Sequence, residues 1–150
     1  MKIRALTLST VDYVLECQKE DAKEDQIIFK LKPLSARQQA QLQDGLDFEI
    51  DSASIKKLRK DAEKIEKGKV SQEDAYDLMR KIKNFNEHLY NNLRCGLVGW
   101  ENFKDEKNKA IKFDDTNIDA MLDLIPRDYH MELATQVMDL TTLKEEEKKK

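Results

Sequence analysis

The 150-residue sequence contains few cysteines, glycines and prolines, and it has no long apolar run. Its two cysteines, Cys17 and Cys95, form no CxxC pair, which favours reduced thiols over a disulfide framework or a zinc site. No segment approaches the roughly 20 apolar residues that a membrane span needs. Charged and hydroxyl side chains interrupt residues 1–10 before the apolar core of a signal peptide could form. We therefore expect a cytoplasmic protein that does not cross a membrane.

The sequence also lacks a strong excess of charge of one sign. It has 27 basic and 30 acidic residues, and the net charge of -3 offers no global attraction to nucleic acid or to an anionic membrane. A chain of this length can bury roughly two thirds of its unfolded surface as one domain. We therefore expect a single globular domain over residues 1–143. Residues 144–150 contain only charged side chains and are predicted to form a disordered tail.

The pattern of apolar residues predicts a mainly α (α+β) fold. Tyr13–Leu15 and Ile27–Leu31 are β-branched and aromatic runs, which favour a small N-terminal antiparallel β-hairpin. Ser35 and Gln38 have the spacing of a capping box, which starts a helix over residues 36–43. Apolar residues at helical spacing then predict several further helices. These helices are expected at residues 55–65, 71–97, 114–125 and 127–140, with Ser71 and Asp114 as the N-caps of the second and third. The second is the long core helix, and its buried stripe is expected to include Leu78, Met79, Ile82, Phe85 and Leu89.

The sequence shows no motif of metal ligands or of a catalytic nucleophile. His88 and His130 have no Cys, Asp or Glu at a metal-ligand spacing, and neither cysteine stands in a nucleophile motif. The segment that begins at Asp105 resembles a calcium loop only superficially, because Lys107 and Lys109 replace oxygen ligands. We therefore expect a protein that is not an enzyme, has no cofactor and no metal, and acts by binding another chain.

Two charged regions of opposite sign could carry such binding. In residues 55–69, seven basic side chains stand against three acidic ones, whereas residues 114–139 contain seven acidic side chains and only one basic one. This asymmetry favours head-to-tail self-association or attraction of a charged partner helix. The structural alternative is a solvated charged surface.

Apolar side chains on the basic helix form a narrow stripe at Ile55, Leu58, Ala62 and Ile65. The stripe fits a helix that docks in a groove of a partner, or one that packs on its own domain. Trp100 has a similar pair of interpretations. It is a candidate contact residue together with Phe103, or a packing anchor whose indole N–H donates to a carbonyl.

The order of short motifs in the C-terminal half resembles that of tail assembly chaperones of long-tailed (siphovirus-type) bacteriophages. The N-terminal half is similar to the family more loosely, through the strand and Pro-Leu-Ser helix start of residues 26–35, and residues 55–69 have no counterpart. One departure is the turn at Asn108, where many relatives have a glycine. The motifs that carry the resemblance are Gly99-Trp100-Glu101-Asn102-Phe103, Asp105-Glu106, Ile111-Lys112-Phe113, Asn117-Ile118 and Leu122-Asp123-Leu124-Ile125-Pro126.

The resemblance implies a non-enzymatic role in virion assembly in the cytoplasm of a bacterial host. Members of this family bind the hydrophobic, helical tape measure protein, keep it soluble and help to recruit tail tube protein. The expected protein-binding residues are Ile55, Leu58, Ile65, Trp100 and Phe103. The alternative function is a nucleic-acid-associated helical adaptor that uses the basic helix of residues 56–69, whose phosphate contacts would make binding salt-dependent.

Overall fold

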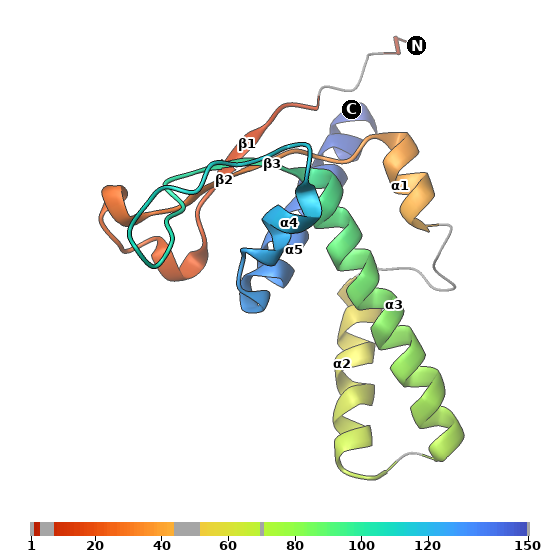
Figure 1. Cartoon of the computed structure of the whole chain (residues 1–150). Coiled ribbons are helices and arrows are strands. Elements are labelled where there is room, and N and C mark those ends of the chain that lie inside the picture. Colours follow the sequence, from red (N-terminus) through yellow and green to blue (C-terminus); the bar gives the residue numbers. More distant parts are fainter. Residues whose placement is uncertain (1, 4–7, 44–51, 70, 150) are drawn as a thin grey trace.

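The computed structural model describes residues 2–3, 8–43, 52–69 and 71–149, but not the side chains of residues 52–55 and 144–149. This part of the chain forms five α-helices and one small antiparallel sheet (Figure 1). The fold is therefore mixed α+β and mainly α, as the sequence predicts.

The sheet has three strands in the order β1-β2-β3, with antiparallel neighbours. Strands β1 (Val11–Tyr13) and β2 (Ile28–Leu31) form the predicted N-terminal hairpin, and β3 (Leu97–Glu101) adds a third strand beside β2. The sequence analysis missed β3 because it continued the long helix to Leu97. The strand forms because Val98 and Trp100 favour extended backbone and Trp100 pairs with Phe29 of the central strand.

Polar side chains order the long connection between β1 and β2, which contains the 3-10 turns Glu16–Gln18 and Lys23–Asp25. The side-chain amide of Gln26 donates hydrogen bonds to the carbonyls of Gln18 and Asp21, each at 3.1 Å. Asn102, just after β3, donates to the carbonyls of Glu24 and Gln26 at 2.6 and 3.0 Å. These bonds satisfy loop carbonyls and hold the connection against the sheet.

Helix α1 (Ala36–Gln43) follows β2 and begins with the predicted capping box. The backbone N–H of Gln38 donates to the Ser35 hydroxyl at 3.2 Å, and the N–H of Ser35 donates to the Gln38 side chain at 3.0 Å. The N–H of Leu34 donates to the hydroxyl of Thr141 at 2.9 Å, which joins the start of this helix to the last helix.

Helices α2 (Ser52–Glu66) and α3 (Gln72–Gly96) form an antiparallel pair that projects from the rest of the molecule (Figure 1). Gly68 between them has φ +65°, a conformation that glycine adopts without the cost of a Cβ. The Ser71 hydroxyl accepts a hydrogen bond from the N–H of Asp74 at 3.2 Å, so Ser71 is the N-cap that the sequence predicts. We call α2 together with residues 72–84 of α3 the arm.

Helices α4 (Ile118–Asp123) and α5 (Arg127–Lys149) complete the chain. The predicted cap at Asp114 is wrong: Asn117 accepts the hydrogen bond from the N–H of Ala120, and Asp114 instead accepts two bonds from Thr116. Residues 144–149 belong to α5, whereas the sequence analysis placed a disordered tail there. Lysine and glutamate are strong helix formers, which explains why the helix continues.

The chain makes a short turn between β3 and α4, and Asn108 lies in this turn. Lys104 and Ala110 form an isolated antiparallel bridge, and the Asp105 carboxylate accepts bonds from the N–H groups of Lys107 and Lys109 at 2.9 Å each. Asn108 has φ +61°, the left-handed conformation that asparagine tolerates better than most residues other than glycine. The asparagine therefore meets the backbone requirement that a glycine would meet in this turn.

The hydrophobic core lies where the sheet, the C-terminal half of α3, α4 and α5 meet. Gly96 of α3 lies against Val137 of α5, and a Cβ at Gly96 would come within 2.4 Å of a Val137 methyl carbon. We call the sheet, α1, α4, α5 and residues 85–96 of α3 the body. Its fully buried side chains include Phe29, Leu31, Leu93, Leu122, Leu133 and Val137.

Candidate protein-binding surface

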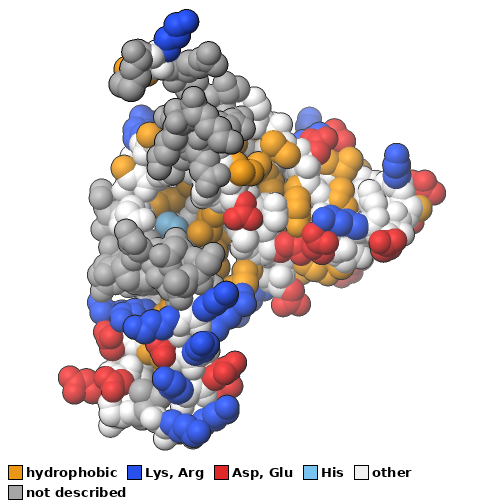
Figure 2. All heavy atoms as spheres, turned by 180° about the vertical axis from the view of Figure 1, so that it is seen from behind, with side chains coloured by type: hydrophobic (Ala, Val, Ile, Leu, Met, Phe, Trp, Pro, Cys, Tyr) orange, Lys and Arg blue, Asp and Glu red, His pale blue; other side chains and the backbone are white. Residues whose placement is uncertain are grey.

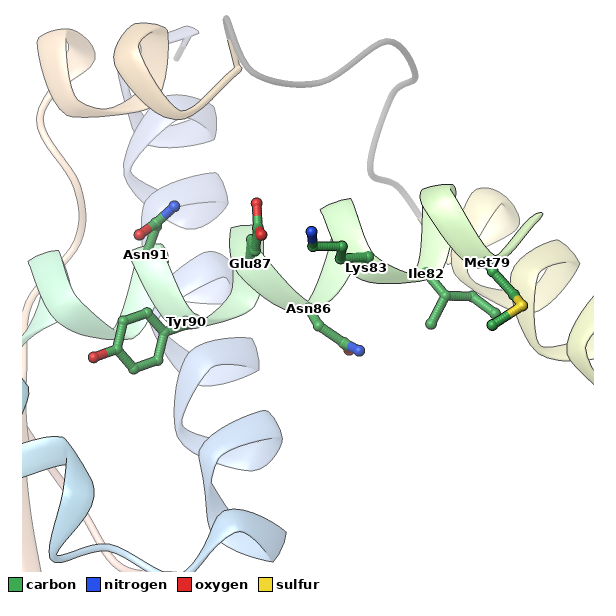
Figure 3. Close-up of a pocket in the computed structure, with 7 residues that line it drawn as sticks. All are labelled: Met79, Ile82, Lys83, Asn86, Glu87, Tyr90 and Asn91. Atoms are coloured by element: carbon green, nitrogen blue, oxygen red, sulfur yellow. The ribbon is translucent and has the colours of Figure 1, made fainter. Parts of the chain in front are cut away.

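An open groove of about 770 Å³ runs along α3, from the arm to the body. Its apolar part is made by Met79, Ile82 and the ring of Tyr90. Figure 3 shows the side chains of Met79, Ile82, Asn86 and Tyr90 along one side of α3. An apolar centre with a polar rim is the usual composition of a surface that receives an amphipathic helix. The lining residues are Met79, Ile82, Lys83, Asn86, Glu87, Tyr90 and Asn91.

The groove exists because α3 has apolar side chains on two faces. One face holds Leu78, Phe85 and Leu89, which are buried. The other holds Tyr76 and Met79, whose exposed fractions are 66% and 59%. Exposed large apolar side chains in a row on one helix face indicate a contact surface. The sequence analysis assigned Met79 to the core stripe of α3, and this assignment is wrong because Met79 lies on the exposed face of the helix.

Polar contacts to α4 close one end of the groove. The Tyr90 hydroxyl donates a hydrogen bond to Asp119 at 3.0 Å, and the Arg94 guanidinium pairs with the same carboxylate at 3.1 Å. Burial, and then the bond to Asp119, raise the pKa of Tyr90 above its usual value, so its hydroxyl stays protonated at neutral pH. These contacts fix the orientation of the Tyr90 ring at the end of the apolar centre.

The basic side chains of α2 lie on the outside of the arm. Lys56, Lys57, Arg59 and Lys60 are exposed, and Lys64 lies 3.9 Å from Asp61 on the same helix. Figure 2 shows lysine and arginine side chains gathered over the arm. The predicted basic segment is therefore accessible to a partner.

Two of the five predicted contact residues are buried in the body. The exposed fractions of Trp100 and Phe103 are 8% and 9%, and the centroids of their rings are 4.9 Å apart. The indole N–H of Trp100 donates to the carbonyl of Ile111 at 2.8 Å. Phe113 packs edge-on against Trp100, also at 4.9 Å. These contacts support the packing-anchor interpretation of Trp100, because a partner could not reach its ring without displacing the turn.

The other three predicted contact residues lie on α2. Leu58 and Ile65 are half-buried, and Leu58 packs against the hydrophobic core. The side chain of Ile55 lies outside the described residues. For Leu58 and Ile65, the structure thus favours packing on the domain. Leu58 and Trp100 do not share an exposed site.

A smaller cavity of about 130 Å³ lies between α1, α3 and α5. It contains His88, Asn92 and Thr141, together with apolar side chains such as Leu42 and Met138. The Nδ1 atom of His88 is buried and has no hydrogen-bond partner among the described residues. Burial lowers the pKa of His88 below its usual value, because the charged form loses hydration there.

Three observations on the described residues concern metal binding, thiol reactivity and membrane crossing. Among these residues, no three His, Cys, Asp or Glu side chains are grouped so that they could hold a metal ion. Burial raises the pKa of the Cys95 thiol above its usual value, which opposes formation of a reactive thiolate. Over the same ranges, no helix combines the length and the apolar character that crossing a bilayer requires.

Comparisons of the chain with protein-family profiles, with curated proteins and with solved structures gave no match. The family resemblance of residues 99–126 therefore stays a prediction. The surface that sequence reasoning missed is the groove of α3. Its signal in the sequence is the row Met79, Ile82, Asn86 and Tyr90, whose spacings of three, four and four residues place the side chains along one side of the helix.

Proposed function

We propose that this chain is a non-enzymatic tail assembly chaperone, which binds the tape measure protein of a long-tailed bacteriophage and helps to recruit tail tube subunits. The groove of α3 is the observation that carries this proposal. A tape measure protein is a long helical chain whose apolar stripe aggregates when it is exposed. A groove whose apolar part includes Met79 and Ile82 can cover such a stripe, and its polar rim lets the partner leave again.

The composition of the groove suits transient and tolerant binding. Methionine is flexible and polarisable, so Met79 can adjust to different apolar side chains along a long client. Lys83 and Glu87 give the rim charges of both signs, which can steer a helix that carries mixed charges. The exposed basic residues of α2 provide a second electrostatic contact for acidic segments of the same client. Binding in the cytoplasm of the bacterial host would follow from this role.

Co-expression with the tape measure protein encoded beside this chain tests the proposal. We expect the client to move from the insoluble to the soluble fraction and to co-purify with the chain. Met79→Asp should weaken co-purification roughly tenfold, because it puts a charge into the apolar centre of the contact. Leu143→Asp is the matched control, since Leu143 is exposed on α5 and does not line the groove. Unchanged client solubility together with no co-purification would contradict the proposal.

The exposed basic side chains of α2 favour one alternative, a nucleic-acid-associated adaptor. Lys56, Lys57 and Lys60 lie on a projecting helix, where they could reach phosphates. This function predicts binding to duplex DNA that weakens steeply between about 50 and 200 mM salt, because each phosphate contact releases counterions. Fluorescence anisotropy with a labelled duplex measures it. The absence of binding at low salt excludes this alternative and leaves the chaperone proposal intact.

A further inference from the structure

The groove of α3 is complementary to a second copy of itself. Four of its lining side chains follow the order Met79, Lys83, Glu87 and Tyr90 along the helix, so that an apolar residue stands at each end of this set and opposite charges stand between them. Reversal of the helix direction exchanges Met79 with Tyr90 and Lys83 with Glu87. A surface that pairs with its own reversed copy is the requirement for a two-fold symmetric interface.

We propose that the groove of α3 binds a second copy of this chain, with the two α3 helices antiparallel and related by a two-fold axis near residue 85. This register sets Lys83 of each copy opposite Glu87 of the other, because both residues lie two positions from the axis. Met79 lies six residues and Tyr90 five residues from the axis, or about 9 and 7.5 Å along the helix, so these two side chains come close to each other across the interface. Each dimer therefore contains two ion pairs and two apolar contacts.

The charges of the rim select this arrangement over a parallel one. A parallel pair would place Lys83 against Lys83 of the other copy, and like charges repel at this spacing. In the described part of the chain, Lys83 and Glu87 form no ion pair. Lys83 and Glu87 are both exposed, so each is available to the other copy.

A second charge complementarity acts at the ends of the interface. In the antiparallel arrangement, the tip of each arm points towards the body of the other copy. The tip carries the exposed side chains of Lys67 and Lys69, and α4 of the body carries the exposed Asp123. The opposite charges of the arm and of the C-terminal region would then lie near each other, and they would favour the same direction of docking.

The dimer uses the surface on which the proposed function relies, but it does not depend on the identity of the client. A second copy in the groove covers Met79 and Tyr90 while no client is present, and a client helix would displace it. Tests on the purified protein alone therefore separate the two ideas. A dimer without client binding would refute the proposed function only, and client binding by a strict monomer would refute this inference only.

Sedimentation equilibrium over a range of concentrations tests the dimer and its ion pairs. We expect a monomer–dimer equilibrium that Lys83→Glu and Glu87→Lys each weaken roughly tenfold, because each change makes two like-charge contacts per dimer. The double variant, with both changes, should recover most of the affinity because it restores two opposite-charge pairs. Lys112→Glu, a charge reversal on an exposed lysine outside the groove, should have little effect.

Disulfide cross-linking tests the register in a Cys17→Ser background. Asn86→Cys lies about 1.5 Å along the helix from the axis, so this variant should cross-link to itself. Met79→Cys should not cross-link to itself, but it should cross-link to Tyr90→Cys when the two variants are mixed. A protein that stays monomeric up to about 100 μM overturns the inference. A dimer in which Met79→Cys cross-links to itself, or in which the double charge reversal fails to recover, overturns it as well.

Discussion

The body and the arm differ in how completely they bury their apolar side chains. In the body, Leu93, Leu133 and Val137 are fully buried between α3, α5 and the sheet. In the arm, Leu78 is the one described apolar residue that reaches comparable burial, while Met79 on the next position stays exposed. The same helix, α3, takes part in both regions. The difference shows that burial depends on how many elements surround a helix, because α2 is the one described helix that runs beside this part of α3.

The largest expected effect compares truncations of the two regions. Leu133→Ala in the body should lower the free energy of unfolding by about 3 kcal/mol, since it leaves a cavity among fully buried side chains. Leu78→Ala in the arm should cost about half as much, because one neighbouring helix covers it. Denaturant unfolding measures both values. Hydrogen exchange should show faster local opening of the arm alone for Leu78→Ala. Equal costs would mean that the arm is packed as tightly as the body.

The crossing of α3 and α5 offers a second way to disturb the body. Gly96→Ala should lower the free energy of unfolding by about 2 kcal/mol, because its methyl group overlaps the buried Val137 side chain. The added Val137→Ala change should offset part of this loss, so the double variant should be more stable than the sum of the single variants predicts. Thermal unfolding measures the coupling. An additive result would show that the two residues do not constrain each other.

Capping of α3 tests the arm separately. Ser71→Ala removes the hydroxyl that accepts from the N–H of Asp74, and we expect a loss of about 1 kcal/mol. Because the helix start lies at the far end of the arm, exchange should increase over residues 71–80 and remain unchanged in the body. Ser71→Asp is the matched control, since aspartate is also a good N-cap. Faster exchange throughout α3 would indicate that the arm and the body open together.

His88, at the junction of α1, α3 and α5, should make the stability of the protein depend on pH. Burial lowers the pKa of His88 below the usual 6.5, so the unfolded chain binds this proton more readily than the folded protein does. Stability should therefore be fully retained above about pH 6.5 and should fall as the pH drops below that value. His88→Gln should flatten this part of the profile. Urea unfolding at a series of pH values measures the slope, and an unchanged slope in the variant would assign it to other groups.

Local patterns in the sequence predicted the local parts of the fold. The capping box at Ser35, the cap at Ser71 and the extent of α1 depend on residues within a few positions of one another, and each was found where the sequence places it. Strand β3 could not be predicted in this way. Leu97 and Trp100 continue the apolar pattern of α3, and only the pairing with β2, about 70 residues away, decides that the backbone becomes extended.

The candidate surface was predicted less well than the fold, for a related reason. Periodicity assigns apolar residues to a face but does not show which face another helix will cover. Met79 and Leu78 are adjacent in the same apolar pattern, yet one is exposed and the other is buried. Trp100 was a candidate contact together with Phe103, whereas its contacts with Phe103 and Ile111 place it in the core.

The antiparallel pairing of α2 and α3 allows the reach of the arm to change without a change in the body. Equal insertions in both helices next to Gly68 would lengthen the arm by about 5.4 Å for each added turn. Gly96 and the sheet would keep their positions, because the chain leaves and re-enters the body at the same places. The basic residues 55–69 lie in the part whose length such insertions would change. The length of the arm therefore sets how far these charges stand from the core, independently of the packing that holds the body together.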